Sequence, residues 1–222
     1  MITPTYIKEL QLLSDHRLIA GVDEVGRGPL AGPVISAVVI LDPDKVGRYR
    51  SKTKWWLGVR DSKTVPEQKR EELVEFIRDN CLDFAIGSAT NKEIDELNIH
   101  HASLLSMKRA VENLKITPDL VLVDGRFEIP LGAEVNTAIS QKAIIGGDAH
   151  VLSIAAASIL AKVFRDDLMR KYDQDFPQYG FADHKGYNTT FHRQALVSLG
   201  ACEIHRMTFP ALKSIINRRS VI

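Results

Sequence analysis

The segment Ile19-Ala-Gly-Val-Asp-Glu-Val-Gly-Arg-Gly-Pro-Leu-Ala-Gly-Pro-Val-Ile-Ser36 predicts two strands joined by a glycine-rich turn. Runs rich in Val and Ile that are bounded by Gly and Pro are typical of strands. The first run leads directly into Asp23 and Glu24, so two acids stand at a strand end, where α/β sheets bind ligands. A plain hairpin with solvated carboxylates is the alternative, but it gives no reason for Arg27 to stand between two glycines.

Length and composition are those of an ordinary globular protein. The 222 residues suffice for one domain, which we expect to span 1–222 with a C-terminal helical portion at about 180–222 packed on it. Hydrophobic residues make up 45% of the chain and charged residues 26%. The formal charge of +1 gives no overall attraction to nucleic acid, so any basic face must be local.

The sequence gives no sign of secretion or of a membrane segment. Cys81 and Cys202 lie far apart without metal-type spacing, which favours free thiols in a reducing compartment. Residues 1–18 mix charged and apolar side chains and lack the apolar core of a signal peptide. No apolar run approaches the roughly 20 residues that span a bilayer. We therefore expect a cytoplasmic protein with no membrane contact.

Strand-like and helix-like segments alternate along the chain, which predicts a single α/β domain. Apolar runs predict strands at 18–24, 34–41, 84–89, 118–124 and 144–148. Helical spacing predicts helices at 4–13, 65–80, 91–114 (in two pieces), 149–174, 190–199 and 209–218. Thr64-Val-Pro-Glu67 predicts a capping box, Asp42-Pro-Asp44 a turn and Asp183 to Tyr187 a loop. Alanines along the 149–174 helix should let it approach the sheet closely.

Four acids fall at the boundaries of predicted elements: Asp23, Glu24, Asp124 and Asp148. Asp124 follows a continuous apolar run, and a buried charge is costly unless it is paired or coordinated. A turn residue before Gly125 and a helix N-cap are the alternatives for Asp124 and Asp148. Together the four acids offer oxygen ligands without a Cys or His cluster, which favours Mg²⁺ or Mn²⁺. Two such ions can activate water and stabilise the leaving oxygen in phosphodiester cleavage.

Several separate motifs, in order, cover nearly the whole chain. They are Asp-Glu-Val-Gly-Arg-Gly-Pro-Leu-Ala-Gly-Pro at 23–33, Asp61-Ser-Lys63, Val-Leu-Val-Asp-Gly at 121–125, Gly147-Asp148, Ala-Ala-Ser-Ile-Leu-Ala-Lys-Val-Phe-Arg-Asp at 156–166, His184-Lys-Gly-Tyr187 and His205-Arg206. With these motifs the chain resembles the type 2 ribonuclease H family, ribonuclease HII. The resemblance implies a ribonuclease H-like fold, in which helices flank a mixed five-stranded sheet.

The resemblance also implies an activity and its substrates. The expected enzyme is an endonuclease that cleaves RNA in RNA–DNA hybrids and at single ribonucleotides in duplex DNA. Water is the nucleophile, cleavage falls on the 5′ side of the ribonucleotide, and the products are 3′-hydroxyl and 5′-phosphate ends. Such an enzyme removes misincorporated ribonucleotides from DNA. We expect a monomer, and no protein partner can be inferred from the sequence.

Residue roles follow from the same resemblance. Asp23, Glu24, Asp124 and Asp148 match the metal-binding acids, with two ions in the reacting complex. The backbone of Gly26-Arg27-Gly28 matches the segment that reads the ribose 2′-hydroxyl, the group that distinguishes RNA from DNA. The remaining predicted substrate contacts are made by Tyr187, packed on the sugar beside the ribonucleotide, and by phosphate contacts at Ser62, Lys63, His184 and Lys185.

Other positions leave alternatives open. Lys162 and Arg165 lie on the long helix, where a solvated or structural role competes with phosphate binding. Arg60 stands where the family usually has Asn, and Gly146 replaces a common Lys. An extra loop is expected around 128–140, and the basic, Trp-bearing stretch at 45–60 resembles an insertion that either contacts nucleic acid or packs on the domain.

Three other functions would account for parts of this sequence. The sister type 3 family shares the fold and the acids, but it usually carries an N-terminal domain and lacks the tyrosine matched by Tyr187. A non-catalytic hybrid-binding protein is disfavoured, because clustered acids repel a polyanion unless metal lies between them. A nucleotide-binding protein is disfavoured because neither Gly-x-x-x-x-Gly-Lys-Ser/Thr nor Gly-x-Gly-x-x-Gly occurs in the glycine segment.

Overall fold

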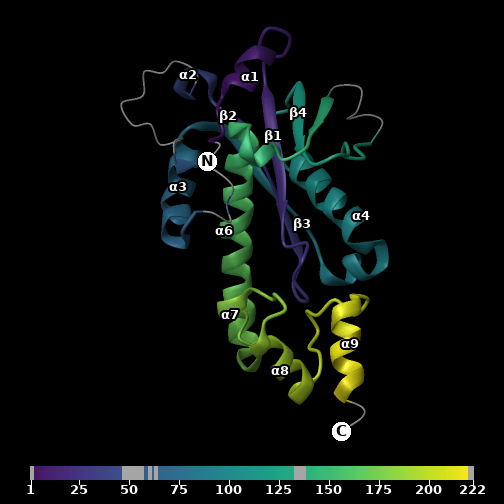
Figure 1. Ribbon diagram of the computed structural model, residues 1–222. Helices are drawn as coiled ribbons and strands as arrows, with labels where there is room; N and C mark the ends of the chain where they lie inside the picture. Colours follow the sequence, from purple (N-terminus) through teal and green to yellow (C-terminus); the bar gives the residue numbers. More distant parts are fainter. Residues whose placement is uncertain (1–2, 47–57, 60–61, 63–64, 133–138, 220–222) are drawn as a thin grey trace.

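A mixed five-stranded sheet forms the centre of the molecule (Figure 1). The computed structural model describes residues 3–46, 58–59, 62, 65–132 and 139–219. The sheet order is β3-β2-β1-β4-β5, with strands β1 (Ile19–Val25), β2 (Val34–Leu41), β3 (Cys81–Ala89), β4 (Leu120–Asp124) and β5 (Ser140–Ile144). β1, β2 and β3 pair antiparallel, whereas β4 runs parallel to β1 and to β5. The expected mixed sheet is confirmed, and β1 and β4 end at the same edge.

Helices cover both faces of the sheet. The helices in the described ranges are α1 (Ile7–Leu12), α2 (Pro43–Val46), α3 (Glu67–Asp79), α4 (Asn91–Glu112), η3 (Gly147–Ala149), α6 (Leu152–Asp175), η4 (Pro177–Tyr179), α7 (Phe181–His184), α8 (Thr190–Leu199) and α9 (Pro210–Arg219). α3 and α6 pack on one face and α4 on the other. Figure 1 shows α7, α8 and α9 gathered near the C-terminal end of α6, beyond the end of the sheet.

The central strand β2 shows why the core has two halves. Side chains alternate between the faces of a strand. Ile35 and Val39 therefore join the core with α3 and α6, whereas Val38 and Ile40 join the core with α4. All eight residues of β2 are buried, which accounts for a sequence that is apolar except at Ser36.

Helix α6 lies unusually close to β1. A Cβ atom at Gly21 would overlap the backbone of Ser153 and Ile154, so only glycine allows this approach. Ala155, Ala156 and the neighbouring small residues are fully buried against the sheet. The expected close packing of the long helix is confirmed, and it fixes α6 beside the end of β1 that carries the acids.

Several predicted elements agree with the structure, including both pieces of the 91–114 helix. Asn98 has φ 68 and ψ 164 inside α4, and its side-chain oxygen accepts the backbone N–H of His100 at 2.9 Å. The residue therefore ends one helical segment and caps the next. No helix in the part of the chain that the structure describes is long and apolar enough to cross a membrane.

Other boundary predictions are wrong for identifiable reasons. The strand expected at 144–148 is β5 at Ser140–Ile144, because Gly146 has φ 62 and leads into η3 instead of extending the strand. Helix α3 begins at Glu67 and not at 65, after Pro66 with ψ 149, and no side chain caps its first turn. Thr64, the first residue of the predicted capping box, lies outside the described residues. A capping box does occur at Thr90–Glu93, at the start of α4.

The remaining differences concern short segments. The turn predicted at Asp42-Pro-Asp44 continues as helix α2, and the loop predicted from Asp183 begins within helix α7. Most of the basic stretch at 45–60 and part of the loop expected at 128–140 lie outside the described residues.

Candidate active site

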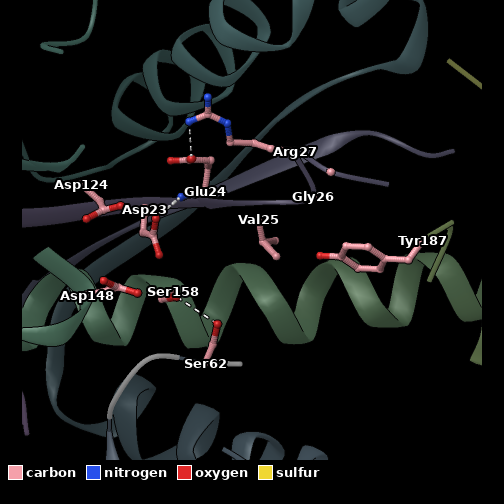
Figure 2. Close-up of a pocket in the computed structure, with 11 residues that line it drawn as sticks. Asp23, Glu24, Val25, Gly26, Arg27, Ser62, Asp124, Asp148, Ser158 and Tyr187 are labelled. Carbon is pink, nitrogen blue, oxygen red and sulfur yellow. Dashed lines mark hydrogen bonds and ion pairs between the residues drawn. The ribbon is translucent and has the colours of Figure 1, made fainter. Parts of the chain in front are cut away.

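The parallel pairing of β1 with β4 brings the predicted acids together. Val22 is in register with Val123, so Asp23 and Asp124 follow side by side at the same edge of the sheet. Ligand oxygens of Asp23, Glu24 and Asp124 all lie within 4.8 Å of one another. Asp148, in η3 after β5, lines the same cavity (Figure 2). The four acids therefore come from three neighbouring strand ends.

The cavity that holds the acids has a volume of about 160 Å³ and extends along α6 toward Tyr187. Its lining residues are Asp23, Glu24, Val25, Gly26, Arg27, Gly28, Ser62, Asp124, Asp148, Ser158 and Tyr187. The acids lie at one end of the cavity. The glycine turn, residues 26–28, and Tyr187 lie at the other end (Figure 2). One hollow thus contains most of the residues that the sequence singled out.

The carboxylates raise one another's pKa values. Burial raises the pKa of Asp23 well above its usual range, and the charges of Glu24 and Asp124 add to the increase. Burial, with the charges of Asp148 and Glu24, raises the pKa of Asp124 to about 6. Backbone N–H groups of Gly147 and Asp148 oppose this increase, and the Gly147 bond is 2.7 Å long. The cluster therefore concentrates more negative charge than the protein neutralises there.

The donor set fits a hard divalent cation. Asp23 is only 5% exposed and its carboxylate accepts the Glu24 N–H at 2.7 Å. Of the described residues that line the cavity, Arg27 alone is a cation, and it pairs with Glu24 at 3.0 Å on the more exposed side. Oxygen ligands without nearby sulfur or imidazole are those that Mg²⁺ and Mn²⁺ prefer. A metal ion would supply the missing positive charge.

The glycine turn after β1 faces Tyr187. Gly26 has φ +93, and a Cβ atom there would overlap the side chain of Arg165. At Gly28 a Cβ atom would lie 3.7 Å from Cε1 of Tyr187, so the ring lies directly beside this part of the turn. The tyrosine is 40% exposed and its hydroxyl points along the cavity toward Val25 (Figure 2). A sugar in the cavity could contact the turn and the ring together.

Ser62 forms part of the cavity wall next to α6. Its hydroxyl lies 3.0 Å from that of Ser158, and its carbonyl accepts a hydrogen bond from Arg70 at 3.1 Å. Arg70 also pairs with Asp166 at 3.3 Å, and Lys162 pairs with the same carboxylate at 2.6 Å. This buried network ties the Ser62 segment to α6. Lys63 lies outside the described residues.

His184 and Lys185 do not line the cavity. The His184 ring bonds to the Tyr179 carbonyl at 2.7 Å and accepts the Gly186 N–H at 3.1 Å. The Lys185 ammonium donates to the Ala182 carbonyl. Both side chains thus stabilise the loop that carries Tyr187, and their contact with phosphate stays a prediction.

Three residues at or behind the cavity, Ser158, Arg165 and Arg206, were not predicted to contribute to the site. Ser158 lies within the motif at 156–166 and had no predicted role, yet it lines the cavity, and its hydrogen bond partly offsets the raised pKa of Asp23. Its polarity among buried alanines was the available signal. Arg165 is fully buried, which supports the structural alternative for that residue, and Arg206 is also fully buried. Nothing local in the sequence indicates which distant backbone these arginines bind.

Acids at the ends of β1 and β4 and after β5, on a mixed sheet flanked by helices, define the ribonuclease H class of metal-dependent nucleases. The crystal structure of ribonuclease H2 from Pyrococcus horikoshii OT3 superposes with a TM-score of 0.75 at 28% identity, covering 91% of this chain and 99% of that one.

The model of the family described as Ribonuclease HII matches residues 20–212. The ribonuclease HII of Syntrophotalea carbinolica is 44% identical over 212 residues, covering 96% of this chain and 94% of the relative. That of Shewanella oneidensis is 47% identical over 201 residues, covering 90% and 91%. The chain belongs to the ribonuclease HII family and is a ribonuclease H.

Proposed function

We propose that this enzyme cleaves the RNA strand of RNA–DNA hybrids and the 5′ side of single ribonucleotides in duplex DNA. The products would be 3′-hydroxyl and 5′-phosphate ends, and the biological role would be removal of misincorporated ribonucleotides. The observation that carries the proposal is the single cavity with carboxylates at one end and the glycine turn with Tyr187 at the other. A reacting phosphate and the ribose attached to it could occupy these two ends together.

We assign the cation to Asp23, Glu24, Asp124 and Asp148, with Mg²⁺ or Mn²⁺ bound as two ions in the reacting complex. The close oxygen ligands and the raised pKa values of two of these acids support the assignment. When bound, two such ions supply an activated water and stabilise the leaving oxygen. The carboxylates hold and orient the ions, and without a cation they would repel the phosphate backbone.

Selection of the sugar falls to the other end of the cavity. The N–H groups of the 26–28 turn are suited to read a 2′-hydroxyl, because glycine lets the backbone come close to a ligand. Tyr187 would pack on the neighbouring sugar and limit where the strand can lie. These groups would contact the sugar and not the base edges. Selectivity should therefore depend on the sugar and the duplex shape, and not on the base sequence.

The test uses a DNA duplex with one embedded ribonucleotide, incubated with Mg²⁺, with Mn²⁺ or with chelator. Metal-dependent cutting on the 5′ side of the ribonucleotide is expected, with none in an all-DNA duplex. Asp124→Asn should lose the activity, whereas Asp119→Asn should keep it, because Asp119 binds backbone N–H groups at the opposite end of β4.

Two other outcomes would change the assignment. Cutting of long hybrids without cutting at a single ribonucleotide would contradict the role given to the turn and to Tyr187. Metal-independent binding of hybrids without any cutting would instead favour the non-catalytic binding function.

A further inference from the structure

A buried arginine from a distant part of the sequence binds the backbone of the glycine turn. Arg206 lies between α8 and α9 and is fully buried. Its guanidinium donates to the carbonyls of Gly26 at 2.6 Å, Arg27 at 3.0 Å, Gly32 at 2.9 Å and Pro33 at 3.2 Å. A single side chain thus binds both ends of the turn that leads from β1 to β2.

A second buried arginine joins this turn to the Tyr187 loop. Arg165 on α6 donates to the carbonyls of Ala31 and Pro33, each at 3.1 Å, and to that of Lys185 at 3.0 Å. The Leu30 N–H also donates to the Gly186 carbonyl at 2.8 Å. The two segments that flank the sugar end of the cavity are therefore fixed relative to each other through backbone carbonyls.

The carbonyl contacts of Arg206 determine where two N–H groups point. The described peptide bonds are trans, and in a trans peptide the C=O and the following N–H point in opposite directions. Because the Gly26 and Arg27 carbonyls face Arg206, the N–H groups of Arg27 and Gly28 face away from it. Both residues line the cavity, and neither N–H meets an acceptor within the described ranges.

The charge of the arginines is costly in this position. Burial lowers the pKa of Arg206 to about 9 and that of Arg165 to about 10. Among the described residues neither guanidinium forms an ion pair with a carboxylate; both bind carbonyl oxygens. The planar guanidinium of arginine can donate to several carbonyls at once, which a lysine or a neutral side chain cannot do. This need explains why two neighbouring cations are buried here despite the cost.

We propose that Arg206 is a positioning residue for ribose selection. By binding the Gly26 and Arg27 carbonyls, it turns the next two N–H groups toward the cavity as paired donors for a 2′-oxygen. The inference rests on the proposed function, because it assumes that the turn reads the sugar. It adds the residue that orients the turn, and Arg206 itself need not touch the substrate.

The test measures sugar preference separately from stability. Dissociation constants are determined for a one-ribonucleotide duplex and for the all-DNA duplex, with Ca²⁺ in place of Mg²⁺ and the strand checked to be intact. Arg206→Lys keeps a charge but loses the fork, and it should reduce the preference for the ribonucleotide at least fivefold. Leu196→Ala, a buried change in the C-terminal apolar cluster, should lower Tm and leave the preference unchanged.

The possible results distinguish the proposed function from the proposed role of Arg206. A wild-type protein without any ribonucleotide preference would overturn both the proposed function and the role of Arg206. A wild-type preference that a folded Arg206→Lys protein retains would overturn the role of Arg206 alone. A parallel loss of preference in Leu196→Ala would assign the effect to general destabilisation and would also overturn it.

A measurement on the wild type covers the case in which Arg206→Lys does not fold. The Arg27 and Gly28 amide protons should exchange rapidly in the free protein, because they face the cavity. They should be protected by the one-ribonucleotide duplex and not by the all-DNA duplex. Slow exchange of both amides in the free protein would show that they do not face the cavity, and it would overturn the proposal.

Discussion

Replacing Asp124 by Asn should stabilise the metal-free protein while abolishing its function. The charged carboxyl is disfavoured by burial and by Asp148 and Glu24, which together raise its pKa from 3.8 to about 6. That increase corresponds to about 3 kcal/mol, and solvent screening of this partly exposed group reduces it to roughly 1–2 kcal/mol. An Asn oxygen can still accept the Gly147 N–H, so the fold of η3 should survive.

Urea unfolding at pH 8, in chelator and then in Mg²⁺ or Mn²⁺, measures the effect. In chelator the variant should exceed the wild type by roughly 1–2 kcal/mol in free energy of unfolding. With metal at about a hundred times its dissociation constant, the wild type should gain about 2.7 kcal/mol, because the ions bind only the folded state. The variant should gain far less. The order of the two stabilities therefore inverts between the two media.

Asp119→Asn is the matched control. Asp119 directly precedes the same strand, but its carboxylate accepts the N–H groups of Arg17 and Leu18 at 2.8 and 3.0 Å, and these bonds lower its pKa. Removing that charge should reduce stability in both media. If Asp124→Asn also destabilises the protein in chelator, the acids do not repel one another as inferred, and the case for a cation site is refuted.

Three further predictions concern the fold around the site. Gly21→Ala should destabilise by about 1–3 kcal/mol, since its Cβ atom would overlap the α6 backbone; Gly132→Ala, in open space, should be near neutral in urea unfolding. Burial lowers the pKa values of His192 and His205 to about 4, so their contribution to stability is complete above pH 6.5 and is lost as the pH falls toward 4. Unfolding free energy should fall by roughly 2 kcal/mol per histidine between pH 7 and 5, and His205→Gln should flatten this dependence; an unchanged slope would contradict it. Asp166→Ala should cost about 3–5 kcal/mol in the same assay, because it leaves two largely buried cations without their carboxylate; a cost below about 1 kcal/mol would contradict the reasoning.

The acids were predictable because their signal is local. Asp23 and Asp124 each follow an apolar run that predicts a buried strand, whereas the β1–β4 pairing that brings them together is seen only in the structure. The predicted strand at 144–148 runs past the end of β5 because Ile144 and Ile145 are identical in type, yet Ile145 is 69% exposed beyond the strand. An apolar pair does not show where a sheet ends. The predicted helix start at 65 precedes that of α3 because Pro66 is extended, with ψ 149, although the sequence at 64–67 matches a capping box.

The contacts that could not be predicted join segments far apart in the chain. Arg206 binds carbonyls about 180 positions away, and backbone carbonyls carry no residue-specific signal. The same holds for the Ser62–Ser158 contact across 96 positions. Side-chain identities at the site were therefore readable from sequence, whereas the groups that orient its backbone became visible only in three dimensions.

The order of residues along β1 explains physically why binding of the sugar and placement of the phosphate should be linked. Asp23 and Glu24 lie near the end of β1 at the proposed ion site, and the proposed sugar-reading turn at 26–28 follows after one residue, Val25. The separation between the two functions is thus set by a few covalent bonds. Pairing of Glu24 with Ser36 on β2 fixes the strand, and Arg206 fixes the turn. Because neither end can shift without the other, a deoxyribose that leaves the turn unoccupied should also leave its phosphate poorly placed at the acids.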